Sequence, residues 1–334
     1  MRTLRNAAVV LAISVGVALH SPAIAEGDAK AQGDARAQAD AAYPSRPLRV
    51  IVPSTAGGPI DTFARLVGAE LNKRFGQPVV VENRPGGGLA IAMDVIVKAA
   101  GDPYTLLFSA HSVGFSNLAV KNPNYDPARD VTPIGILGGA GFFLSVPATL
   151  PVKSMAELVA YVRANPGKLN MGEAGVPTPE IEDMLGQLGM RLERVNYKGG
   201  GPMYSALLAG EIQLALTNAL QSASNGGKLR TLAYTDLKRH PTLPAVPTVA
   251  ESVLPNFQSR VWQGLFGPAN ISPPVVAKLN AEMRDMLKSP EVLDKVLTVG
   301  YQPMPLDVEA TRSEFNWVIK HFQALAAKGL ITPQ

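Results

Sequence analysis

Residues 54–61, Ser-Thr-Ala-Gly-Gly-Pro-Ile-Asp, place hydroxyl groups and adjacent glycines where an apolar strand-like run gives way to a helix-like one. Glycines allow backbone N–H groups to turn toward one point, and the start of a helix carries partial positive charge. Together they can hold an anion such as a carboxylate without a cationic side chain. A tight turn also uses glycines for its own geometry, so the spacing leaves both interpretations open. The sequence patterns of phosphate-binding and dinucleotide-binding loops are absent.

A second segment of the same type is 172–179, Gly-Glu-Ala-Gly-Val-Pro-Thr-Pro. Thr178 is either a helix N-cap or a hydroxyl donor to a ligand. Ligands of open α/β sheets bind beyond the carboxyl ends of the strands. The two segments could therefore face each other across a cleft.

Histidines and cysteines offer little further chemistry. The sequence has no cysteine, which excludes disulfides, thiol catalysis and thiolate metal sites. His111, His240 and His321 lack the spacing of metal ligands, so neither a metal nor a cofactor is expected. Ser109 lies close to His111 in the chain, but sequence neighbours rarely form a catalytic dyad, and no Gly-x-Ser-x-Gly turn is present. We expect His111 to be a cleft wall or structural, and the protein not to be an enzyme.

Strands and helices must alternate to position these loops. Short β-branched runs predict strands at 48–53, 79–81 and 104–109, separated by helices that begin near 61 and 89. This order is typical of parallel βαβ units and an open doubly wound sheet. Later segments repeat the pattern: strands at 142–146, 169–171, 212–216 and 229–234, and helices at 154–165, 179–188, 205–208, 274–288, 290–299 and 307–328.

The N-terminus is typical of an export signal. Arg2 and Arg5 precede an apolar run at 7–19, and Ala23-Ile24-Ala25 fits a signal peptidase site. The run is shorter than the roughly 20 residues of a membrane span. We predict a signal peptide over 1–25, cleaved near Ala25-Glu26, and a periplasmic location.

Two compositional features concern the exported chain. Residues 26–42 contain no large apolar side chain, which predicts a flexible linker. The formal net charge of +4 falls to +2 when Arg2 and Arg5 leave with the signal peptide. With charges interspersed and aromatics at only 6%, nucleic acid is not an expected partner.

From residue 43 to the end, the sequence closely resembles the Bug-type extracytoplasmic solute receptors of tripartite tricarboxylate transporters, the TctC-like periplasmic substrate-binding proteins. The resemblance rests on motifs in consistent order: Ile51-Val52-Pro53 with Ala56-Gly57-Gly58, Asp61 and Ala64-Arg65; Val81-Glu82-Asn83-Arg84-Pro85-Gly86; Tyr104-Thr105-Leu106-Leu107; Asn165-Pro166-Gly167-Lys168; Tyr197-Lys198-Gly199 with Pro202; Leu229-Arg230; Pro244 with Val246-Pro247-Thr248-Val249-Ala250-Glu251; and Trp262 with Gly264 and Pro268.

Membership implies an α/β protein with a two-lobe type II periplasmic-binding-protein (Venus-flytrap) fold, each lobe an open doubly wound sheet flanked by helices. Lobe one would take 43–138 and 258–334, and lobe two 139–257. The implied function is capture of a small carboxylate-containing solute, an organic acid or amino acid, by a monomer that serves the membrane components of a tripartite tricarboxylate transporter. Two alternatives stay open: a sensor that feeds a kinase, and an exported hydrolase that uses Ser109 and His111.

The resemblance and the loops together predict a ligand-binding set: Ser54, Thr55, Ala56, Gly57, Gly58, Asp61, His111, Glu173, Gly175, Val176, Thr178 and Thr217. The chain departs from the family pattern at several of these positions. Ser54 replaces an aromatic residue, Pro177 removes an amide donor, and an acid common near Thr217 is missing. Glu173 replaces a serine and could bring negative charge to the cleft. The resulting hypothesis is a ligand that carries a cationic group as well as a carboxylate.

Overall fold

The computed structural model describes residues 37–174 and 179–333. These residues divide into two units, one that ends at Tyr43 and one that begins at Pro44. The predicted signal peptide and most of the predicted linker lie outside the described residues. In the first unit, residues 37–41 form one helical turn, closed by a bond of 3.1 Å from the N–H of Ala42 to the carbonyl of Gln38. These residues belong to the predicted flexible linker, and their alanines favour the turn because alanine has the highest helix propensity.

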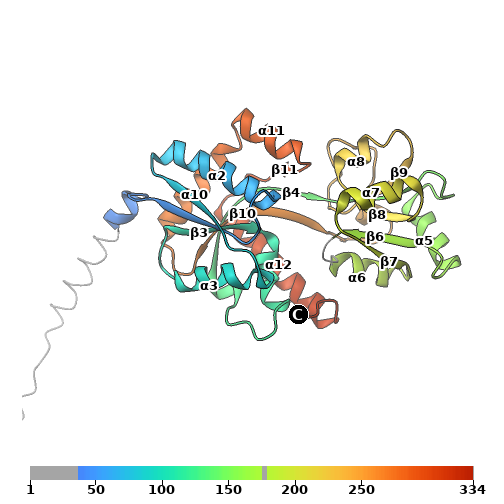
Figure 1. Ribbon diagram of the computed structural model, residues 1–334, viewed down its shortest axis with the longest axis horizontal. Coiled ribbons are helices and arrows are strands. Elements are labelled where there is room, and N and C mark those ends of the chain that lie inside the picture. The colour runs from blue at the N-terminus through green and yellow to red at the C-terminus, as the bar shows by residue number, and fades with distance from the viewer. Residues whose placement is uncertain (1–36, 175–178, 334) are drawn as a thin grey trace, which may run out of the picture. The chain divides into compact units, whose positions relative to one another are not determined.

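The first sheet of the second unit has six strands in the order β11-β4-β10-β3-β1-β2 (Figure 1). β1 runs parallel to both β2 and β3, as the βαβ pattern predicts. β10 runs antiparallel to β3 and β4, so the complete sheet is mixed. Its strands are β1 Leu48–Val52, β2 Val79–Asn83, β3 Thr105–Ala110, β4 Val131–Gly141, β10 Arg260–Pro268 and β11 Gln302–Pro303.

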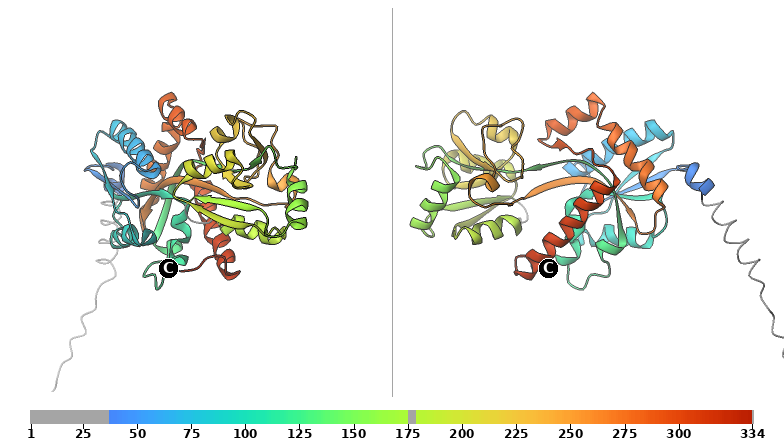
Figure 2. Two further views of the ribbon diagram at one scale, coloured as in Figure 1. Left: turned by 45° about the vertical axis from the view of Figure 1, so that its right-hand side comes forward. Right: turned by 180° about the vertical axis from the view of Figure 1, so that it is seen from behind.

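Helices cover both faces of this sheet. On one face, α3 and α12 pack against Ile51, Leu107 and Trp262 in a single apolar cluster, and α12 crosses in front of the strands in the view from behind (Figure 2). On the other face, α2 buries Phe63, Val67 and Leu71, one stripe of an amphipathic helix. The helical segments are α2 Pro59–Phe75, η1 Gly87–Leu89, α3 Ala90–Lys98, η2 His111–Leu118, α4 Pro127–Asp130, α10 Pro273–Met286, α11 Pro290–Thr298 and α12 Val308–Ala327.

The second sheet has five strands in the order β7-β6-β8-β5-β9. They are β5 Phe143–Pro147, β6 Asn170–Ala174, β7 Glu193–Tyr197, β8 Leu214–Thr217 and β9 Leu229–Tyr234, with helices α5 Met155–Ala164, α6 Pro179–Gln187, α7 Gly200–Ala209, α8 Ala219–Ala223 and α9 Val249–Ser252. Ser154 caps α5 as predicted, its hydroxyl accepting from the N–H of Glu157 at 3.2 Å. Two mixed sheets flanked by helices confirm the predicted two-lobe α/β class. Within the described ranges, no helix is both long and apolar enough to span a bilayer.

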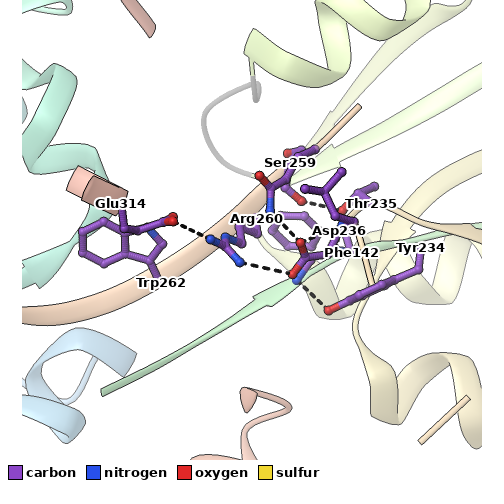
Figure 3. Close-up of polar contacts among 11 residues, drawn as sticks. Phe142, Tyr234, Thr235, Asp236, Ser259, Arg260, Trp262 and Glu314 are labelled. Carbon is purple, nitrogen blue, oxygen red and sulfur yellow. Dashed lines mark hydrogen bonds and ion pairs between the residues drawn. The ribbon is translucent and has the colours of Figure 1, made fainter. Parts of the chain in front are cut away.

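The chain passes between the sheets at residues 141–143 and returns at 259–260, and one buried hydroxyl joins the two passages (Figure 3). Thr235 Oγ1 accepts from the N–H of Phe142 at 2.7 Å and donates to the carbonyl of Ser259 at 2.6 Å. Beside it, the N–H of Gly141 donates to the hydroxyl of Tyr234 at 2.8 Å. The end of β9 therefore connects the outgoing and returning segments.

A charged group extends this junction toward α12. Arg260 lies 3.8 Å from the carboxylate of Asp236 and donates to Glu314 of α12 at 2.5 Å. Trp262 Nε1 donates to the other oxygen of Glu314 at 3.0 Å (Figure 3). Because these groups are largely buried and mutually bonded, they fix the first residues of β10 against both sheets.

Replacing Thr235 with valine keeps the shape of the side chain but removes the partner of the partly buried Phe142 N–H and of the buried Ser259 carbonyl. We expect Thr235→Val to lower the free energy of unfolding by about 2–4 kcal/mol, measured by urea denaturation. The control is Thr242→Val, at an exposed residue, which should change it by less than about 0.5 kcal/mol. Equal losses for the two variants would contradict this role of Thr235.

Candidate functional site

The loop between β1 and α2 lies at the carboxyl end of β1, and Thr55, Ala56 and Gly57 are exposed. Gly57 has a φ of +82°, a left-handed conformation that favours glycine. Its N–H donates to Asp61 Oδ2 at 2.8 Å, and the N–H of Gly58 points to the carbonyl of Thr55 at 3.4 Å. In this conformation the loop uses both amides internally, and the binding of an anion by Gly57 and Gly58 stays a prediction.

Other donors remain at the start of α2. Among the described residues, no acceptor contacts the backbone N–H of Ala56 or of Ile60. The first N–H groups of a helix have no partner within the helix and carry its partial positive charge. An anion held by this loop would thus bond to amides on either side of the two glycines.

Asp61 fixes the shape of the loop. The residue is only 2% exposed, and its carboxylate accepts from Gly57, from Arg65 Nε at 3.0 Å and from Asn83 Nδ2 at 2.9 Å. Asn83, at the end of β2, also donates to the carbonyl of Ser54 at 2.9 Å. The Arg65 hydrogen bond, with that of Gly57, lowers the pKa of Asp61 to about 2. Asp61 is therefore ionised and fully engaged, and it positions the loop.

His111 lies in an aromatic enclosure. It is buried, with the rings of Phe115, Trp262 and Phe322 at centroid distances of 5.6, 6.1 and 5.9 Å. Burial, with a smaller effect of Arg260, lowers the pKa of His111 to about 4, so the ring is neutral at physiological pH. The Ser109 hydroxyl and His111 Nδ1 are both buried without hydrogen-bond partners among the described residues. The dyad needed by the hydrolase alternative is therefore not formed.

Thr217, at the end of β8, belongs to a chain of buried hydroxyl groups. Its Oγ1 lies 2.8 Å from the hydroxyl oxygens of both Ser145 and Ser222 and donates to the carbonyl of Phe143. The residue is 1% exposed. These contacts use the Thr217 hydroxyl within the second sheet. In this conformation the hydroxyl is therefore not available to a ligand.

Glu173, on β6, forms an ion pair with the neighbouring strand. Arg194 of β7 lies 3.2 Å from its carboxylate and also contacts Glu182 of α6. The Glu173 side chain is 12% exposed. Burial raises the pKa of this carboxyl, while Arg194 acts in the opposite direction. Arg194 is shared between Glu173 and Glu182, so one positive charge faces two carboxyl groups, and the cationic-ligand hypothesis stays a prediction.

The remaining predicted residues divide into two groups. Gly175, Val176 and Thr178, with Pro177, lie outside the described residues. Ser54 is partly buried, and its hydroxyl has no hydrogen-bond partner among the described residues.

Arg65 and Asn83 are absent from the predicted set although they hold the loop. Both lie in the distinctive sequence motifs, and Asn83 follows the strand that neighbours β1. Because β2 lies beside β1, the end of β2 could have been expected to contact the loop after β1, and this signal could have identified Asn83.

A family model described as the tripartite tricarboxylate transporter family receptor matches residues 63–315. The protein BugT of Bordetella pertussis is 32% identical over 281 residues, which cover 81% of this chain and 85% of BugT. A protein from the tcbD-tcbE intergenic region of Pseudomonas sp. strain P51 is 33% identical over 265 residues, covering 78% of this chain and 79% of its own length.

Solved structures are similar over most of the chain. The adipate-bound R. palustris protein Rpa4515 is 30% identical with a TM-score of 0.69, covering 87% of this chain and 100% of that one. MatC of Rhodopseudomonas palustris with bound malate is 30% identical with a TM-score of 0.64, covering 85% and 99%.

Replacing Asp61 with asparagine should remove an acid-sensitive part of the stability. The pKa of Asp61 is lower in the folded protein than the ordinary value of 3.8, so the ionised carboxylate stabilises the fold fully above pH 4 and ceases to do so as the pH falls toward 2. We expect Asp61→Asn to cost about 1–3 kcal/mol at pH 7, and the difference from the unsubstituted protein to shrink at pH 3 and below.

Urea denaturation at pH 7, 4 and 3 measures this difference. Asp94→Asn is the control, since it removes an exposed carboxylate paired with Lys98 at 2.7 Å, worth about 0.3–0.5 kcal/mol. A pH-independent difference for Asp61→Asn would show that the carboxylate charge does not hold the loop.

Proposed function

Because the chain belongs to the family of tripartite tricarboxylate transporter receptors, we propose that it is a periplasmic solute receptor for a small carboxylate-containing ligand. The observation that carries the proposal is the loop at residues 54–58, which Asp61 and Asn83 hold in one conformation at the start of α2. The adipate and malate bound to two solved relatives support a carboxylate as the ligand class.

The electrostatics of the loop suit a carboxylate. Asp61 is negatively charged, but Arg65 contacts it at 3.0 Å, so the pair adds no net charge beneath the loop. The N–H groups of Ala56 and Ile60 and the partial positive charge of α2 are then the nearest donors for an anion. Fixed backbone donors bind a carboxylate with little reorganisation, which favours affinity.

The second half of the proposed site is the segment 175–178 after β6. Each lobe, 43–138 with 258–334 and 139–257, would supply one loop, and closure of the lobes would complete the contacts. Such binding proteins enclose the solute between domains and gain specificity from few polar groups. The receptor would bind and release the solute without chemical change and would need no metal or cofactor.

Export and delivery complete the proposal. The signal peptide over 1–25 would direct the chain to the periplasm, with cleavage near Ala25. There the receptor would act as a monomer and pass its solute to the membrane components of a tripartite tricarboxylate transporter.

Substitution at Gly57 tests the loop directly. We expect malate, adipate or a related acid to raise the Tm of the protein by mass action, by a few degrees at about 100 times Kd. Gly57→Ala should weaken this binding about tenfold or more, because alanine disfavours the φ of +82° that shapes the loop. Calorimetric titration gives the Kd of each variant.

Gly101→Ala is a matched control. Gly101 has the same φ of +82°, and a Cβ atom at either glycine would meet nothing within 4 Å. The two substitutions should thus cost similar stability, while only Gly57→Ala should affect the ligand. Equal affinities for the two variants, or no Tm shift with any carboxylate in a broad panel, would count against the proposed function.

A further inference from the structure

A cavity of about 210 Å³ lies between α6, α12 and the segment 254–258. Its lining combines acidic, amide and aromatic side chains: Glu180, Asp183, Gln187, Leu254, Pro255, Asn256, Phe257, Gln258, Trp317 and His321. The volume equals the share of roughly seven water molecules in the liquid. It is smaller than the pockets that hold drug-sized ligands, so it suits a small ligand.

Glu180 is the unusual member of this lining. It is only 4% exposed, and its carboxyl group accepts a hydrogen bond from its own backbone N–H. No cation pairs with it among residues 37–174 and 179–333. Burial raises the pKa of Glu180 to about 7. A buried carboxyl without a counter-ion is unfavourable when ionised, unless a ligand supplies the positive charge.

The other charged groups at the cavity balance one another. Asp183 of α6 accepts two hydrogen bonds of 2.8 Å from Lys328 Nζ, at the end of α12. His321 of α12 stacks on Trp317 with a centroid distance of 4.6 Å, and burial lowers its pKa, so it is neutral at pH 7. The segment 254–258, Leu-Pro-Asn-Phe-Gln, carries no titratable side chain. One negative charge, that of Glu180, is left to be matched.

The polar groups of the lining present acceptors to a ligand. Gln187 Nε2 donates to Asp183 at 2.8 Å, and Gln258 Nε2 donates to Asp236 at 2.7 Å. Each bond uses one of the two N–H groups of the amide, so the carbonyl oxygen of each glutamine and one further N–H remain for a ligand. His321 Nε2 is buried and has no hydrogen-bond partner among the described residues. Aromatic rings, which attract cations, also line the cavity at Phe257 and Trp317.

We propose that this cavity is a binding site for a small organic cation with N–H donors, an alkylammonium or alkylguanidinium ion, and that Glu180 is its counter-ion. The cation would occupy a site built from α6 of one sheet and α12 of the other. Its binding would therefore favour the arrangement in which these two helices pack together, as the Asp183–Lys328 pair already does. The site goes beyond carboxylate capture and does not depend on it.

Calorimetric titration of the full-length mature protein with ethylammonium chloride and methylguanidinium chloride tests the proposal. We expect saturable binding of one cation per chain, tighter at pH 8 than at pH 6, because Glu180 must lose its proton to pair with the cation. At pH 7, titrations in phosphate and in Tris should give different heats, since the released proton is taken up by the buffer.

Glu180→Gln removes the charge and keeps the size of the side chain. It should weaken cation binding at least tenfold and abolish the buffer dependence. Glu182→Gln, the matched control on the same helix, removes an acid that pairs with Arg194 outside the cavity lining, and it should bind the cations normally. The Tm of each variant establishes that it is folded.

Three results would overturn the proposal: no saturable binding of either cation to the folded protein, the same affinity after Glu180→Gln, or binding of Mg²⁺ in place of both organic cations. A separate titration with malate and adipate distinguishes the two proposed sites. Carboxylate binding without cation binding would reject the cavity site alone, and the reverse would reject the proposed function alone.

Discussion

The hydroxyl of Thr235 accepts a hydrogen bond from Phe142 and donates one to Ser259, so one side chain holds both segments that connect the two sheets. Arg260 follows immediately and contacts Asp236 and Glu314. A buried donor and a buried acceptor would each be left unsatisfied if these segments separated, which makes the junction costly to open. The junction therefore ties the end of β9 to both segments that connect the sheets.

Charge pairing also determines the shape of the loop between β1 and α2, the proposed ligand loop. An aspartate under an anion-binding loop is unfavourable unless its charge is compensated, and Arg65 compensates Asp61. The acid then contributes geometry: it draws in the N–H of Gly57 and, through Asn83, fixes the carbonyl of Ser54. Among the described residues, the N–H groups of Ala56 and Ile60 on either side of the glycines have no acceptor. The glycines thus supply the turn, and the amides beside them are the donors that the proposed function assigns to a ligand.

The fold class and most helices could be predicted because their apolar patterns are regular, and β9 was placed at its observed bounds. The long strands β4 and β10 could not be predicted. In β4, Pro133 and glycines at 135, 138, 139 and 141 resemble turn residues. In the sheet these glycines serve close packing: a Cβ atom at Gly139 would lie 2.7 Å from Trp262 Cβ, and one at Gly138 would lie 2.8 Å from the carbonyl oxygen of Gln302. Glycine is needed here because other segments pack closely against the strand. Those segments are distant in the sequence, so a local pattern does not reveal them.

Glu173 and Glu180 show why the charge of a site is harder to infer than its loops. Both flank the same loop, and the sequence drew attention to Glu173 because it departs from a family pattern. The two acids differ in their ion pairs. β7 places Arg194 beside Glu173, whereas Glu180 is enclosed by α6, α12 and uncharged residues of 254–258. Burial raises the pKa of both carboxyls, but Arg194 opposes the rise at Glu173 and no described cation does so at Glu180. Tertiary packing therefore determines which acid has a counter-ion and which does not.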